Sequence, residues 1–319
     1  MRFPEFSGEW NKYTINDLAT VVGGGTPDTT VKSYWGGDIQ WFTPSEIGKN
    51  KYVDFSKRTI TRDGLDNSSA KLLPLHTILL SSRATVGECS IASNECTTNQ
   101  GFQSLIAKQC NIDFLYYLIQ TKKKDLIRNA CGSTFLEISA NEIRKIKVAV
   151  PVQNEQEQIA KLLSLIDERI ATQNKIIEKL QSLIKGLVDE LMTVLLKGKL
   201  YPFSSFYIKA GEGGTPTTSV VEYYTEGTIP FIKIEDLSCK YLTNNKDFIT
   251  ELGMQKSSAW LIPSKSVIYS NGATIGAISI NEYPVCTKQG ILGIVPNTNI
   301  NVEYLYLLMS SSYFLKFRK

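Results

Sequence analysis

Gly24-Gly25-Thr26-Pro27 recurs as Gly213-Gly214-Thr215-Pro216, and this duplicated stretch decides how the whole chain is organised. Further matches at nearly the same offset follow it in order: Ser68-Ser69-Ala70 with Ser257-Ser258-Ala259, Ser82-Arg83-Ala84-Thr85 with Asn271-Gly272-Ala273-Thr274, and Thr98-Asn99-Gln100-Gly101 with Thr287-Lys288-Gln289-Gly290. So many matches over so long a period indicate a duplicated domain, because the repeats of a solenoid are only about 20–50 residues long.

Each copy reads as a mixed α/β domain. The apolar runs 78–81 and 267–270 are typical of buried strands, and 112–126 and 302–317 have the spacing of amphipathic helices. The predicted fold is therefore mixed α/β (α+β), with two homologous globular domains at 1–152 and 200–319 and a different kind of sequence between them.

The intervening segment 153–199 predicts one long helix. Asn154 and Glu157 have the spacing of an N-cap and its N3 carboxylate, no glycine interrupts the run before Gly186, and the pattern continues to Lys197-Gly198. At about 1.5 Å per residue such a helix is roughly 65–70 Å long.

Apolar residues along this segment recur at alternating steps of four and three, which is the heptad pattern of a coiled coil. We call these positions the apolar stripe; Gln173 is its one polar member, and the full set is Ile166, Ile170, Gln173, Ile177, Leu180, Ile184, Leu187, Leu191 and Val194. A long helix enclosed within one globular core is the alternative, but the stripe is narrow and the charges on the other faces balance.

Composition limits the chemistry. The 319 residues are 42% hydrophobic, which is enough for two ordinary domains, and the net charge of +4 permits a nucleic-acid partner without requiring one. The single histidine, His76, excludes multi-histidine metal or catalytic clusters, and we expect it to be structural rather than a general base.

The six cysteines contain no C-x-x-C pair, so we expect them to be reduced and partly buried. No apolar run is long enough to cross a bilayer and the N-terminus lacks the layout of a signal peptide, so the sequence predicts a cytoplasmic protein.

Two copies of one binding domain joined by a stiff helix would recognise two sites at a fixed distance. Double-stranded DNA suits such an arrangement, because successive major grooves recur every 34–36 Å along one face of the duplex.

The motifs also occur in a recognisable order: Gly24-Gly25-Thr26-Pro27, Tyr34-Trp35, Ile39-Gln40-Trp41, Ser82 to Gly87, Thr98 to Gly101, Gly132-Ser133-Thr134, Val150-Pro151 and Glu155-Gln156. This order, with its duplication, resembles the specificity subunit of type I restriction–modification enzymes over almost the whole chain.

The resemblance implies that each copy is a target recognition domain reading one half of a split DNA site. It also implies that the helix sets the gap between the halves and docks methyltransferase subunits, through which the restriction subunit joins. S-adenosylmethionine, ATP and Mg²⁺ would then belong to partner subunits, and this chain would be non-catalytic, with no cofactor or metal of its own.

The sequence departs from this family where the second copy stops, at Phe317-Arg318-Lys319. The end of the second recognition domain and the family's second helix are therefore expected to be absent from this sequence. An apolar stripe of this length needs a cover. We expect another chain to supply it: a second copy, a separate fragment or a methyltransferase helix.

Loops that differ between the copies are the candidate DNA contacts. Arginine suits guanine, and asparagine or glutamine suits adenine. The candidates are Thr43, Ser45, Ser82, Arg83, Thr85, Asn99 and Gln100 in the first copy and Lys233, Glu235, Asn271, Thr274, Lys288 and Gln289 in the second, with Lys57, Arg58, Arg62, Lys233 and Lys256 as phosphate contacts.

Some of these residues also have a purely structural explanation. Arg83 could be held in a buried salt bridge, and Asn99 could reflect surface drift. The Gly24–Pro27 stretch is better explained as a tight turn than as a phosphate cradle, because it lacks the Gly-Lys-Ser/Thr ending of a P-loop.

Two other classes of function compete with DNA reading. A coiled-coil adaptor would bind only proteins, and a nuclease would need its own metal site, for example around Glu235. The second is disfavoured, because the first copy has Thr43 and Ser45 where the second has Lys233 and Glu235.

Overall fold

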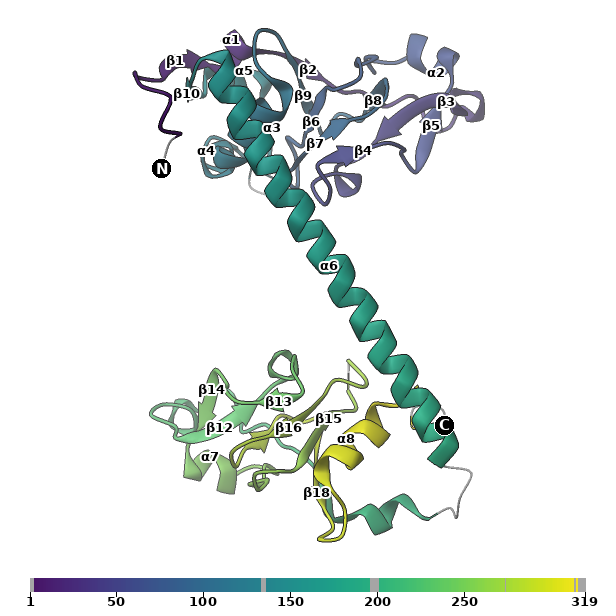
Figure 1. The fold of residues 1–319 in the computed structure, drawn as a ribbon, viewed down its shortest axis with the longest axis vertical. Helices are drawn as coiled ribbons and strands as arrows, with labels where there is room; N and C mark the ends of the chain where they lie inside the picture. The colour runs from purple at the N-terminus through teal and green to yellow at the C-terminus, as the bar shows by residue number, and fades with distance from the viewer. Residues whose placement is uncertain (1–2, 133–135, 196–200, 273, 313, 315–319) are drawn as a thin grey trace. The chain divides into compact units, whose positions relative to one another are not determined.

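The computed structural model describes residues 3–132, 136–195, 201–272, 274–312 and 314. It divides into two compact units, Met1–Gln173 and Asn174–Lys319, and the boundary falls inside the long helix. The mixed α/β class predicted from the sequence is confirmed (Figure 1).

The first unit is built on two sheets. Its five-stranded sheet has the order β2-β9-β6-β7-β4 and its three-stranded sheet the order β5-β3-β8, while β1 and β10 pair separately. The strands are β1 (Asn11–Thr14), β2 (Ala19–Gly23), β3 (Trp35–Phe42), β4 (Tyr52–Val53), β5 (Arg58–Ile60), β6 (Ile78–Leu80), β7 (Cys89–Ala92), β8 (Cys96–Thr98), β9 (Gln103–Ala107) and β10 (Lys147–Val150).

The second unit repeats the five-stranded and the three-stranded sheet strand for strand, with orders β11-β18-β15-β16-β13 and β14-β12-β17. The duplication predicted from the sequence is therefore a duplication of topology. The strands are β11 (Tyr207–Glu212), β12 (Ile229–Ile232), β13 (Tyr241–Leu242), β14 (Asp247–Ile249), β15 (Val267–Ser270), β16 (Ile278–Asn281), β17 (Cys286–Thr287) and β18 (Ile291–Pro296).

Short helices cover the ends of the sheets. In the first unit these are α1 (Ile15–Leu18), α2 (Arg62–Asp66), α3 (Ile112–Thr121), α4 (Lys123–Arg128) and α5 (Ala140–Lys145); in the second they are α7 (Glu251–Gln255) and α8 (Val302–Ser310). The single helix expected at 112–126 is thus two helices that meet at Lys122. The helix expected at 302–317 ends as α8 at Ser310, and Phe317-Arg318-Lys319 lie outside the described residues.

The tight turn expected at Gly24–Pro27 is absent: residues 24–28 form an extended irregular segment after β2, and residues 213–217 do the same after β11. Neither Gly24 nor Gly25 has a positive φ. A Cβ on Gly24 would instead lie 2.0 Å from the carbonyl oxygen of Asn99, and one on Gly25 would lie 2.3 Å from the backbone nitrogen of Ala70. Gly213 and Gly214 are equally confined. Close approach of backbone to backbone, rather than left-handed geometry, is what requires glycine here.

The long helix, α6 (Gln153–Leu195), is 43 residues without a break, or about 65 Å at 1.5 Å per residue. Asn154 was wrong as its N-cap, because Asn154 lies inside the helix. The carbonyl of Val152 already accepts from the N–H groups of Glu155 and Gln156. The predicted continuation to Lys197-Gly198 falls outside the described residues. None of the helices in the described ranges has the length and apolar content needed to span a membrane.

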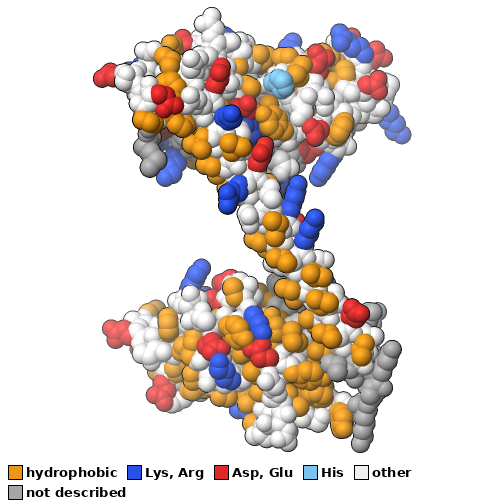
Figure 2. Space-filling model, in the orientation of Figure 1, with side chains coloured by type: hydrophobic (Ala, Val, Ile, Leu, Met, Phe, Trp, Pro, Cys, Tyr) orange, Lys and Arg blue, Asp and Glu red, His pale blue; other side chains and the backbone are white. Residues whose placement is uncertain are grey.

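The apolar stripe is open to solvent: its apolar side chains are 45–60% exposed, from Ile166 at 45% to Val194 at 60%. Leu162, Leu165, Ile176 and Leu183 are exposed beside it, so the surface is wider than the two-position pattern of a simple coiled coil. Figure 2 shows hydrophobic side chains following the helix. Exposure of this kind does not fit a helix enclosed in a core.

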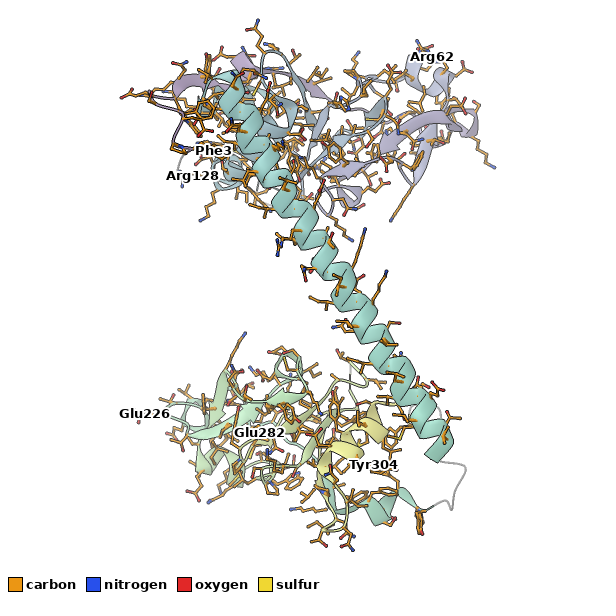
Figure 3. The ribbon with its side chains drawn as sticks, in the orientation of Figure 1. Phe3, Arg62, Arg128, Glu226, Glu282 and Tyr304 are labelled. Carbon is orange, nitrogen blue, oxygen red and sulfur yellow. The ribbon has the colours of Figure 1, made fainter. Side chains whose placement is uncertain are left out.

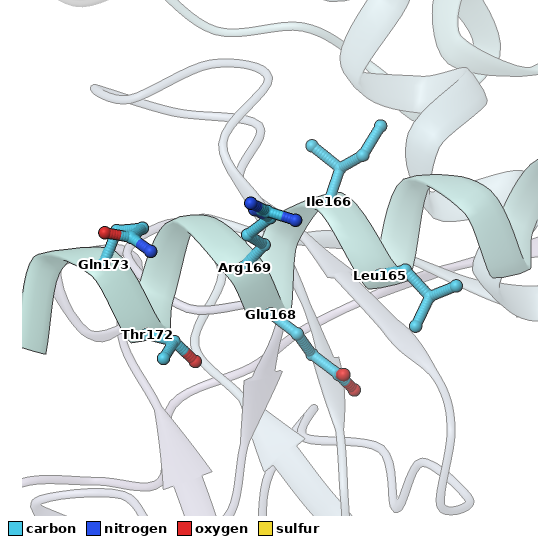
Figure 4. A pocket seen from close by; sticks show the side chains of 6 residues that line it. All are labelled: Leu165, Ile166, Glu168, Arg169, Thr172 and Gln173. Carbon is cyan, nitrogen blue, oxygen red and sulfur yellow. The ribbon is translucent and has the colours of Figure 1, made fainter.

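A shallow hollow of about 620 Å³ follows the first part of this surface. All the residues that line it belong to α6 (Figure 4): Leu165, Ile166, Glu168, Arg169, Thr172 and Gln173.

Two glycines provide a stability test. Gly25→Ala should lower the free energy of unfolding by roughly 1–3 kcal/mol, because its Cβ would displace the backbone at Ala70. Gly186→Ala, in α6 with nothing within 4 Å of its Cβ, should raise helix stability by about 1 kcal/mol. Urea denaturation followed by circular dichroism measures both, and equal effects of the two changes would contradict close backbone approach as the reason for glycine at this place.

Candidate nucleic-acid interface

In the first unit, the three-stranded sheet brings most of the predicted contact residues to one edge. Strands β3 and β8 are parallel, so both end at this edge, where Thr43 and Ser45 follow β3 and Asn99 and Gln100 follow β8. Strand β5 runs the other way, with Arg58 opposite Trp41, and therefore starts at the same edge. We call this edge, with the loops that meet it, the reading edge.

The loop carrying Arg83 joins the reading edge through a pocket of about 260 Å³ lined by Pro44, Arg83, Ala84, Asn99, Gln100 and Gly101. The backbone N–H of Ser82 donates to the carbonyl of Gly101 at 2.8 Å and fixes the two loops together. The side chain of Ser82 is buried and therefore cannot reach DNA, whereas Thr85 is exposed.

Arg83 forms an ion pair, but the pair is not buried as the structural alternative required. Its Nε lies 3.8 Å from a carboxylate oxygen of Glu137, and the two side chains are 45% and 50% exposed. An ion pair this exposed contributes little to stability and is easily exchanged. The side chain of Asn99 is held in place, because its Oδ1 accepts from the N–H of Gly101 at 2.9 Å. A residue that varies by surface drift would not need this hydrogen bond.

The reading edge of the second unit is built in the same way. Parallel β12 and β17 end together, which places Lys233 and Glu235 beside Lys288 and Gln289. The backbone N–H of Asn271 donates to Gly290 at 3.0 Å, and its side-chain Oδ1 is buried with no partner among the described residues. Thr274 is exposed, and Ala273 lies outside the described residues.

Two of the predicted phosphate contacts lie elsewhere. Arg62 begins α2, beyond the far end of β5, where Figure 3 shows it pointing away from the sheet. Its Nε lies 3.4 Å from Asp66. Lys256 follows α7 at the corresponding place in the second unit. The sequence placed both near the loops, but the strand directions put them at the opposite edge.

A polar cluster that the sequence analysis missed attaches α6 to the first unit. Lys51 Nζ lies 2.8 Å from Asp113 and 2.7 Å from the hydroxyl of Ser164 on α6. The hydroxyl of Tyr117 donates to Asp167, also on α6, at 2.6 Å. We call these five residues the helix-attachment cluster. Its members are far apart in the sequence, so no local pattern reveals it.

Hydrogen bonds in this cluster favour the charged form of Asp113 and the neutral form of Tyr117. Burial alone would raise the pKa of Asp113, but hydrogen bonds from Lys51 and Tyr52 outweigh it and lower that pKa. Burial, reinforced by the hydrogen bond to Asp167, raises the pKa of Tyr117, which therefore stays a neutral donor.

The second unit keeps part of this cluster. Lys240 and Tyr241 both contact Glu303, and Lys240 Nζ lies 5.6 Å from the ring centre of Tyr306. Leu307 stands where the first unit has Tyr117. The counterpart of the helix-attachment cluster in the second unit is thus less polar. Near the other end of α6, the N–H of Ser312 in the second unit donates to Asp189 at 2.7 Å.

Within the described ranges, no group of three or more His, Cys, Asp and Glu side chains is arranged to hold a metal ion. His76 is exposed in a turn, with φ of 63°, and its N–H donates to Ala92 at 2.7 Å. Of the cysteines, Cys89, Cys96 and Cys286 are buried, whereas Cys131 and Cys239 are exposed, so the expectation of partial burial was wrong for the last two.

Comparison with known proteins gives one consistent result. Residues 7–182 and 206–318 match the family model of the type I restriction modification DNA specificity domain. The type I restriction enzyme MjaIX specificity subunit of Methanocaldococcus jannaschii is 31% identical over 97% of this chain and 77% of its own length. The EcoR124I/EcoR124II specificity subunit of Escherichia coli is 28% identical over 52% of this chain and 43% of its own length.

Solved structures agree on the fold. The S subunit of a type I restriction–modification system from M. genitalium has a TM-score of 0.50 at 19% identity, covering 97% of this chain and 79% of its own. A second structure, from work on complex assembly and conformational transition of the type I system, has a TM-score of 0.59 at 14% identity, covering 98% of this chain and 82% of its own.

Lys51→Met tests the helix-attachment cluster. It leaves Asp113 without its cation, so the first unit should lose about 1–2 kcal/mol at neutral pH. Because the pKa of Asp113 is lowered in the folded state, its contribution is present above the ordinary carboxyl value of about 4 and is lost as the pH falls through the folded-state pKa. The variant should therefore lose less stability on acidification than the parent chain.

Lys145→Met is the matched control. Lys145 also lies 2.8 Å from a carboxylate, that of Glu142, but its side chain is 71% exposed against 13% for Lys51. Thermal unfolding between pH 3 and 7 compares the two. An equal, small effect from both variants would show that Lys51 does not hold the helix in place.

Proposed function

We propose a function from the family of this chain: it belongs to the type I restriction modification DNA specificity family, and each of its two units reads one half of a split site in double-stranded DNA. The observation that carries the proposal is the repeated reading edge. Each unit has a three-stranded sheet of the same strand order, and in both units polar and charged side chains lie at the equivalent edge of that sheet.

The side chains at the two reading edges differ in the way two different half-sites require. Asn99 in the first unit is replaced by Lys288 in the second, and Arg83 by Gly272. Asparagine pairs with adenine, whereas arginine and lysine pair with guanine, so these exchanges alter which bases are accepted. Where the first unit has the neutral Thr43 and Ser45, the second has one cation and one anion, Lys233 and Glu235, with no difference in net charge.

We assign α6 the role of setting the gap between the half-sites and of docking methyltransferase subunits, which in turn bring in the restriction subunit. A helix without a break over 43 residues is stiff enough to act as a spacer. In this division of labour the chain is non-catalytic. S-adenosylmethionine, ATP and Mg²⁺ are bound by the partners.

The exposed apolar stripe supports a helix from another chain as the cover of α6. Eight apolar side chains with at least 45% exposure in one row would cost far more free energy in water than isolated surface residues do. We propose that a second copy of this chain or a methyltransferase helix fills this place, packing in the knobs-into-holes manner of a coiled coil.

Arg83→Ala tests the reading of DNA. Binding to the preferred duplex should weaken by roughly 1–3 kcal/mol through loss of base preference at one half-site, with the other half unaffected. Arg62→Ala is the control, because Arg62 is an exposed arginine at the opposite edge and should leave the preference unchanged. Titration of duplexes that vary one base pair at a time, at several salt concentrations, measures both the base preference and the salt-dependent contribution of phosphate contacts. Binding that does not depend on salt, or no binding to duplex DNA, would favour an adaptor function.

Ile177→Glu with Ile184→Glu tests the cover of α6. Charges in the middle of the apolar stripe should abolish the association without unfolding the helix, whereas Ser182→Glu, on the opposite side of α6, should leave it intact. Analytical ultracentrifugation of the chain alone and with a methyltransferase subunit measures the mass in each case. A parent chain that stays monomeric under both conditions contradicts the proposal; a dimer of the chain alone identifies a second copy as the cover.

A further inference from the structure

A stacked arginine stands out on the first unit. The guanidinium carbon of Arg58 lies 3.6 Å from the ring centre of Trp35 and 5.4 Å from that of Trp41. The two indole rings meet edge to face at 5.0 Å. Arg58 is exposed, and its guanidinium has no hydrogen-bond or ion-pair partner among the described residues. Its N–H donors are therefore not used by the described part of the protein, and the guanidinium rests on an aromatic support.

The support beneath Arg58 is rigid. The indole N–H groups of Trp35 and Trp41 donate to the carbonyls of Asp28 and Gly25 at 3.1 and 3.0 Å. Ser56, in the turn before β5, donates its N–H to Gln40 Oε1 at 2.7 Å, and its hydroxyl accepts from the N–H of Trp41 at 2.9 Å. A guanidinium held on such a platform loses little conformational freedom when it binds.

The second unit has the opposite charge at this place. Asp247 begins β14 opposite Phe231, as Arg58 lies on β5 opposite Trp41. A carboxylate oxygen of Asp247 lies 2.9 Å from Lys233 Nζ. The charge of Lys233 is therefore neutralised by the residue that occupies the position of Arg58 in the second unit. Tyr224 stands where the first unit has Trp35, and burial raises its pKa, so it stays neutral.

The neighbouring residue behaves differently. Lys57 precedes Arg58, and Lys246 precedes Asp247, so this position is a lysine in both units. The DNA backbone is the same for both half-sites, and a phosphate contact should therefore keep its charge. A position whose charge reverses on the same scaffold, next to one whose charge is kept, is what recognition of different bases requires.

From this contrast we infer that Arg58 is a specificity-determining residue that reads a guanine in the half-site of the first unit, and that Lys57 beside it contacts phosphate. The inference rests on the proposed function and sharpens it, because it separates two residues that sequence reasoning alone had placed together on the backbone. A stacked guanidinium with free in-plane donors matches the paired O6 and N7 acceptors of guanine.

The test is selection from a library of duplex DNA with randomised positions, using the full chain and its Arg58→Ala, Arg58→Lys and Lys57→Ala variants. Both Arg58 variants should lose the preference for guanine at one position by roughly ten- to hundredfold, because lysine keeps the charge but not the planar pair of donors. Lys57→Ala should weaken all sequences alike and reduce the salt dependence, with the selected motif unchanged. Thermal unfolding checks that each variant is folded.

Three other outcomes would overturn the inference. Full retention of the motif by Arg58→Lys, with uniform weakening by Arg58→Ala, would make Arg58 a phosphate contact. An unchanged motif and affinity for Arg58→Ala would reduce the stack to surface packing. Failure of the parent chain to select any motif would overturn the proposed function itself. In the first two outcomes, by contrast, the parent chain still selects a motif.

Discussion

The close approach of two backbones holds each reading edge together. In the first unit the Gly24–Gly25 segment packs directly on the end of β8 and on the Ser69–Ala70 backbone, and the second unit repeats the contact at Gly213 and Gly214. The carbonyl of Gly25 accepts from the indole N–H of Trp41, and the hydroxyl of Thr26 contacts Gln100. One absent Cβ at each position thus allows a loop, a strand end and an aromatic platform to meet.

On this common frame the two units differ in their exposed side chains. The cap of α2 by Thr61 recurs in α7 at Thr250. Each threonine hydroxyl also donates to a backbone carbonyl 28 residues earlier, that of Ser33 in the first unit and that of Glu222 in the second. The charged residues differ. In the first unit Arg58 lies over the ring of Trp35 without a carboxylate partner among the described residues, whereas in the second unit Lys233 forms an ion pair with Asp247. The two domains thus share their strand order and the glycine contacts that position their loops, while the side chains exposed around those loops differ.

Much of this could be predicted from the sequence, and the failures have physical causes. The duplication, the strand 267–270 and the long helix follow from local pattern and were confirmed. Arg62 and Lys256 were misplaced because the edge at which a loop emerges depends on strand direction, which periodicity does not reveal. The helix-attachment cluster and the stack on Trp35 depend on residues that only the tertiary fold brings together.

The central claim is that two units read two half-sites whose separation α6 fixes. It is tested most directly by mapping methylated adenines across a genome in cells that express a methyltransferase subunit with and without this chain. The claim predicts that methylation specific to this chain occurs at one split motif with a gap of constant length. A single uninterrupted motif, two halves at variable spacing, or a methylation pattern that does not depend on the chain would contradict it.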